Sequence, residues 1–149
     1  MTGEAIRAWL DRHAGLLDEL QQALVAAAAA AGDAVAVLEA GAPDPEVADA
    51  FGRAGEQAHR FLAVLDRAAA VAPISDAETA RHFRRSLERW RDAAQTQREA
   101  ASQGDTAAML RVSHLLGAGT NEFLEFAAAL RRATGRTTAP RGPTPPPTS

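Results

Sequence analysis

The sequence predicts an all-α protein: an antiparallel up-down-up-down four-helix bundle with a long first helix and a disordered, proline-rich C-terminal tail. Three observations predict it. Apolar residues recur at alternating spacings of three and four over four segments, no segment alternates apolar and polar residues, and glycine or proline falls between the segments. Because the expected connections are short, consecutive helices should lie antiparallel.

The first helix is expected over about residues 4–40. Its apolar spacing runs unbroken from Ile6 to Leu38 and passes through Gly32-Asp33 without a change of phase. We therefore interpret this Gly-Asp pair as helical. Gly41 is expected to end the helix, because glycine adopts the left-handed conformation common at helix C-termini.

The other three helices are expected over about residues 45–72, 76–102 and 106–134. Asp44 is the expected N-cap of the second helix, with Pro45 at its first position. Ser75 and Glu78 have the spacing of a capping box at the start of the third helix.

Gly104-Asp105 is interpreted as a turn, because the apolar phase slips there and the neighbouring residues are polar. Two successive four-residue steps would also allow one continuous helix through residue 104. Gly135 is expected to close the fourth helix. The bundle domain would then span residues 1–134, and residues 135–149, with five of the eight prolines, would form the disordered tail.

Composition excludes several classes of function. The 149 residues include no cysteine, so the chain has neither disulfides nor thiolate metal ligands. A net charge of −3 gives no electrostatic case for nucleic acid. The first twenty residues lack the pattern of a secretory signal. The longest apolar run, residues 23–31, is shorter than the roughly 20 residues of a membrane span, so we expect a cytoplasmic protein.

The titratable residues do not form a catalytic or metal-binding pattern. Four histidines fall one per helix, at heights along the axis that keep them from converging on one ion. Glu56 and His59 have the Glu-x-x-His spacing of bundle metal sites, but no second copy exists. Ser113 and His114 point about 100° apart on a helix and cannot form a nucleophile–base pair. We expect no cofactor and no enzymatic activity.

Two features could bind a partner. Arg84, Arg91 and Arg98 recur every seven residues. They either pair with carboxylates of the acidic first helix or form an external binding face.

The second feature is the start of the first helix, which is longer than the other three. Ile6, Trp9 and Leu10 should therefore overhang the bundle as an exposed apolar cluster, suited to self-association or a protein partner. The alternative is that the tail or a bent first helix covers this cluster.

These features predict a non-enzymatic helical interaction or scaffold module. The alternative is a bundle that binds a small ligand or stores metal, because small residues at core positions could leave a cavity; these are Ala27, Ala31, Ala54, Ala58 and Gly119. Small residues also let helices approach closely, so the spacing of the helices decides between the two.

The alanine-rich helices, the two Gly-Asp pairs and the helix starts Pro43-Asp44-Pro45-Glu46 and Ile74-Ser75-Asp76-Ala77-Glu78 resemble those of small helical proteins of actinobacteria. The resemblance covers about residues 4–134. It implies a helical fold and brings no activity, ligand or catalytic residue.

Overall fold

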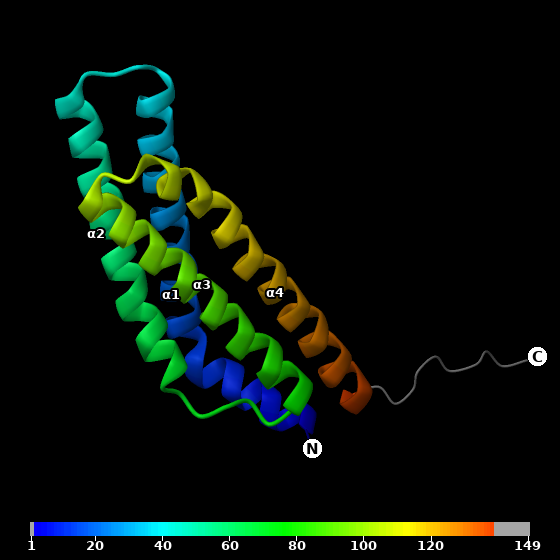
Figure 1. The fold of residues 1–149 in the computed structure, drawn as a ribbon. Helices are drawn as coiled ribbons and strands as arrows, with labels where there is room; N and C mark the ends of the chain where they lie inside the picture. Colours follow the sequence, from blue (N-terminus) through cyan, green and yellow to red (C-terminus); the bar gives the residue numbers. More distant parts are fainter. Residues whose placement is uncertain (1, 139–149) are drawn as a thin grey trace, which may run out of the picture.

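The computed structural model describes residues 2–138, which form four helices and no strand: α1 (Thr2–Glu39), α2 (Asp44–Ala69), α3 (Ala77–Gln103) and α4 (Thr106–Thr138). Each helix packs on two neighbours, and α1 and α4 close the ring (Figure 1). The predicted antiparallel bundle is confirmed. The residues predicted to form a disordered tail lie outside the described part of the chain from 139 onwards.

Both Gly-Asp pairs are as predicted. Gly32 lies inside α1, whereas Gly104 ends α3 with a φ of 65°. The Asp105 carboxylate then caps α4 by accepting from the Ala108 amide at 3.0 Å. Gly41, with a φ of 68°, ends α1 as expected.

The capping box predicted at Ser75 is wrong. Asp76 caps α3 instead, because its carboxylate accepts from the Thr79 amide at 3.1 Å and from the Thr79 hydroxyl at 2.7 Å. Glu78 is thereby free to reach across to α4, where it pairs with Arg132 at 3.3 Å.

Two other helix ends differ from the prediction. Asp44 is the first residue of α2 and makes no side-chain cap; the preceding Pro43 is extended, with φ −60° and ψ 151°. The carboxylate still stands in the first turn, where it complements the helix dipole. Gly135 does not end α4, which continues to Thr138.

The predicted overhang at the N-terminus is also wrong. In Figure 1 the first turns of α1 bend beneath the bundle toward the start of α3, and the projecting end is the α1–α2 connection. Ile6 is fully buried and Trp9 is 4% exposed. The Trp9 indole donates to the Ala72 carbonyl at 2.7 Å and meets Phe83 edge-on at 5.5 Å. An overhang would require a straight α1, but its first turns bend, as in the alternative given for the covered cluster.

Aromatic rings form one continuous run through the half of the core near the N-terminus. Neighbouring ring centroids lie 4.8–6.1 Å apart, in the order His13, Trp9, Phe83, Phe126, Phe123, Trp90 and Phe61. These separations are typical of favourable aromatic pairs. The run joins α1, α2, α3 and α4, and all its members except Trp9 fall on the apolar spacing of the sequence.

Alanines, one glutamine and a few larger side chains such as Phe51 and Met109 fill the other half of the core. Gln97 of α3 is fully buried, and its Nε2 donates to the carbonyls of Ala27 in α1 and Ala54 in α2, at 3.1 and 2.9 Å. A side chain can reach two helix backbones only where the intervening residues are small. Alanine seams therefore bring these helices together, and the core cavity proposed as an alternative is not formed at Ala27 and Ala54.

Gly119 allows side chains of α3 to pack directly against the backbone of α4. The Ser86 hydroxyl donates to the Gly119 carbonyl at 3.1 Å, and the Trp90 indole N–H donates to the Leu116 carbonyl at 3.2 Å. A Cβ at Gly119 would overlap the Trp90 ring. Gly117, by contrast, faces open space.

These two glycines give a matched test. Gly119→Ala is expected to lower the free energy of unfolding by about 1–3 kcal/mol, because the indole must move. Gly117→Ala is expected to raise it by up to about 1 kcal/mol, through helix propensity alone. Urea unfolding of both variants checks this; a Gly117→Ala variant that is no more stable than the wild type would contradict the propensity argument.

Gln97 gives a second test. Gln97→Met should cost only about 1–2 kcal/mol, because it removes two hydrogen bonds but also the buried Oε1, which has no partner among residues 2–138. Gln97→Glu should cost about 3 kcal/mol or more at neutral pH, since it turns a buried carboxylate toward two carbonyl oxygens. Equal stability of the two variants, measured in urea, would refute this role for the amide.

Candidate functional site

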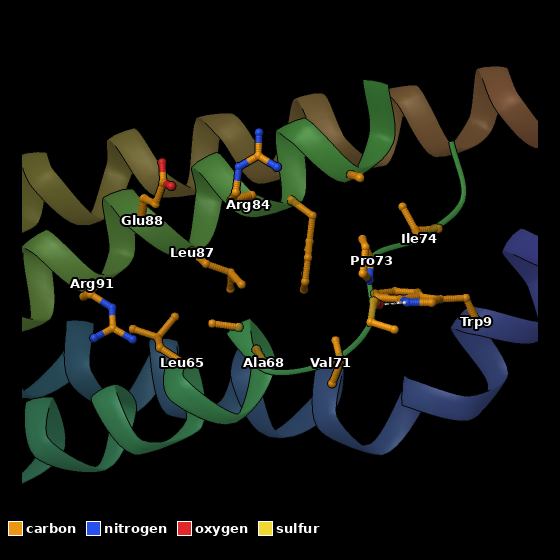
Figure 2. Close-up of a pocket in the computed structure, with 14 residues that line it drawn as sticks. Trp9, Leu65, Ala68, Val71, Pro73, Ile74, Arg84, Leu87, Glu88 and Arg91 are labelled. Carbon is orange, nitrogen blue, oxygen red and sulfur yellow. Dashed lines mark hydrogen bonds between the residues drawn. The ribbon is translucent and has the colours of Figure 1, made fainter. Parts of the chain in front are cut away.

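An apolar cleft of about 420 Å³ opens near the end of the bundle where α2 passes into α3 (Figure 2). We call it the terminal cleft. Side chains from α1, α2, α3 and the α2–α3 connection line it, among them Trp9, Leu65, Ala68, Pro73, Phe83 and Leu87.

The walls of the terminal cleft are held by contacts among the residues that line it. The Trp9 indole fixes the connecting segment through the Ala72 carbonyl, and Ile74 from the same segment is buried in the core. Phe83 stands against Trp9. The hollow is therefore part of the folded structure and needs no rearrangement to form.

Three charged residues of α3 border the terminal cleft. Arg91 forms an ion pair with Asp66 of α2. Arg84 and Glu88 also line the cleft, and within residues 2–138 neither has an ion-pair partner. Figure 2 shows Arg84 and Glu88 standing on the outer side of α3, whereas Arg91 turns toward Leu65.

The terminal cleft brings together three of the six residues predicted to bind a partner, namely Trp9, Arg84 and Arg91. The other three lie elsewhere. Ile6 is in the core, Leu10 is half-buried against it, and Arg98 borders a shallow depression beside His59. The sequence missed the cleft itself because the α2–α3 connection that forms one wall has no apolar periodicity.

The expected pairing of the α3 arginines with α1 is wrong where the structure tests it. Arg91 pairs with α2, and Glu19 of α1 pairs with Arg67 of α2. The reason is topological: α3 neighbours α2 and α4, so α1 lies diagonally across the core.

A second surface, the α1–α4 groove, lies on the side of the bundle where neighbouring helices pack least extensively. Its volume is about 520 Å³ and its lining is mostly small or apolar, including Val25, Ala28, Gly32, Leu110 and Gly117. Val25 is 62% exposed and Leu110 is 53% exposed. Among the described residues one more large apolar side chain, Leu124 of α4, is exposed to this degree, and it lies outside the groove.

The α1 residues that line the groove belong to an apolar stretch that is only partly buried in the core. By length and composition α1 is long and apolar enough to cross a membrane. Only 28% of its most apolar 18 residues are buried in the bundle. The apolar stretch extends past residues 23–31 to Leu38, interrupted by Gly32-Asp33. The expected absence of a membrane span thus stays a prediction, supported by the packing of Ala27 and Ala34 in the core.

Within residues 2–138 no group of three or more His, Asp or Glu side chains could hold a metal ion. His82 of α3 and Glu122 of α4 approach at 3.5 Å, Nδ1 to Oε1, and both side chains are mostly buried. Neither His82 Nδ1 nor Glu122 Oε2 has a hydrogen-bond partner among residues 2–138. His59 and His114 are exposed.

No protein-family model, no curated protein and no solved structure matches the chain. Function has to be inferred from the two surfaces.

The Glu19–Arg67 pair predicts a small pH dependence. The hydrogen bond from Arg67, together with its charge, holds the pKa of Glu19 below the usual carboxyl range. A lowered folded-state pKa stabilises the protein above about pH 4.3, and this contribution disappears as the pH falls through the lowered value. Glu19→Gln should therefore lower Tm slightly at pH 7 in low salt and not at pH 3.

The matched control is Asp18→Asn, which alters an exposed neighbour with no ion pair among the described residues. High salt should also erase the Glu19→Gln effect, because the pair is exposed. An equal loss from both variants at pH 7 would assign the effect to net charge.

Proposed function

We propose that the protein is a non-enzymatic helical interaction module that binds one amphipathic helix of a partner protein in the α1–α4 groove. The observation that carries the proposal is the exposure of Val25 and Leu110, two large apolar side chains on facing edges of one groove. Exposed apolar surface of this kind marks binding sites more often than isolated exposed residues do.

The shape of the groove suits a helix. Beside the exposed Val25 and Leu110, the groove is lined by Ala28 and Gly32 of α1 and Gly117 of α4, whose small size leaves the helix backbones accessible. A Cβ at either glycine would meet nothing within 4 Å. A partner helix with apolar residues at spacings of three and four could therefore lay its backbone close to the groove.

The charge of the groove also favours a particular partner. Glu39, at the end of α1, is the one charged residue that lines it. The partner helix is expected to be apolar along the contact and to carry a basic residue near Glu39. No arrangement of nucleophile, base and oxyanion donors lines the groove, so binding itself is the proposed activity.

Leu110→Glu and Leu124→Glu provide the decisive comparison. Both remove an exposed leucine from α4, but only Leu110 lines the groove. Partner protein from the native host should be retained by the wild type and by Leu124→Glu. The amount of partner retained should fall at least about tenfold for Leu110→Glu and for Val25→Glu, because an interface anchor typically contributes 2 kcal/mol or more to binding.

Quantitative affinity purification followed by native mass spectrometry measures this, and circular dichroism must show unchanged helicity. If the retained species is a second copy of the chain, the partner is the protein itself. Equal losses from Leu110→Glu and Leu124→Glu, or no loss from either, would overturn the proposal.

A further inference from the structure

We propose that the terminal cleft is a separate binding site for a small amphiphilic monocarboxylate, such as a medium-chain fatty acid. The apolar chain would occupy the hollow, and the carboxylate would bind Arg84 at its mouth. This site lies on different helix edges from the α1–α4 groove, and it does not depend on the function proposed for that groove.

The interior of the terminal cleft suits an alkyl or aryl group. Its volume of about 420 Å³ falls within the range of small-molecule sites, roughly 300–1,000 Å³. Leucine, alanine and aromatic carbons form the walls. The polar atom of Trp9 already donates to Ala72, so this indole offers a ligand only its ring surface. The deep part of the ligand should therefore carry no hydrogen-bonding group.

The mouth of the terminal cleft supplies one available positive charge. Arg91 is engaged with Asp66, whereas Arg84 has no ion-pair partner among residues 2–138. A guanidinium binds a carboxylate through two parallel hydrogen bonds. Figure 2 shows Arg84 on the outer side of α3, and its flexible stem allows the guanidinium to turn toward the opening and meet a ligand there. The anionic end of the ligand is therefore assigned to Arg84.

Glu88 restricts the ligand further. It lies one helical turn after Arg84 and lines the same cleft. Its carboxylate repels every negative charge on the ligand, so a dicarboxylate is disfavoured more strongly than a monocarboxylate of the same length. A hollow of this size also takes one short chain and not the two long chains of a phospholipid.

Calorimetric titration of the full chain with octanoate, octanol, octylammonium and suberate tests the proposal. Octanoate should bind at one site, about fivefold more tightly than octanol, as expected for a partly exposed ion pair. Octylammonium and suberate should bind more weakly than octanoate. From hexanoate to decanoate, each added methylene should tighten binding about fourfold until the hollow is full.

Two substitutions localise the site. Arg84→Gln should remove the preference for octanoate over octanol and leave octanol binding unchanged, whereas Arg85→Gln, which alters an exposed neighbour outside the cleft lining, should change neither. Ala69→Trp should abolish binding of both ligands, because Ala69 is exposed and lines the cleft.

Several results would overturn the proposal: no saturable binding of decanoate below its micellar concentration, equal affinity for octanoate and octanol, or equal losses from Arg84→Gln and Arg85→Gln. Binding that survives Ala69→Trp would place the ligand elsewhere. None of these results affects the proposal for the α1–α4 groove, because Leu110, which anchors that groove, does not line the terminal cleft.

Discussion

Side-chain donors on α3 reach backbone carbonyls of all three other helices and tie the bundle together. Ser86 and Trp90 donate to α4, and Gln97 donates to α1 and α2. Each accepting carbonyl lies within a helix and already accepts a backbone N–H of that helix. The side-chain donor therefore bonds to a carbonyl oxygen that accepts more than one hydrogen bond. Because such bonds form only near 3 Å, they fix the helix separations far more narrowly than apolar packing does. Glycine and alanine at the crossings are the condition that makes them possible.

This constraint helps to explain where the two open surfaces lie. The donors described above draw α3 toward its neighbours, and the side between α1 and α4 has the least extensive packing. The groove follows that side. The terminal cleft has a different origin: the start of α1 places Trp9 against the α2–α3 connection, and the cleft lies among Trp9, that connection and the α3 residues Phe83 and Leu87.

Much of the fold follows from spacing, and much of the site does not. The three-and-four periodicity predicted all four helices and placed Gly119 inside, because burial depends on one face of each helix. It could not reveal that Gln97 donates across the diagonal, which depends on helix separation. The bend in α1 escaped because it arises from tertiary contacts of Trp9. Val25 and Leu110 fall off the seams, so their shared groove emerges only when α1 and α4 are placed side by side.

The uneven filling of the core has a consequence for motion. Each buried alanine removes far less apolar area from water than a phenylalanine or a tryptophan, so the half held by the aromatic run gains more from burial than the half around Ala27 and Ala54. Partial unfolding should accordingly start at the projecting α1–α2 connection and spread along the alanine seams, with amide hydrogens there exchanging through openings that leave the aromatic half intact. The bundle would thus behave as two cooperative units along its length, although it is a single domain in space.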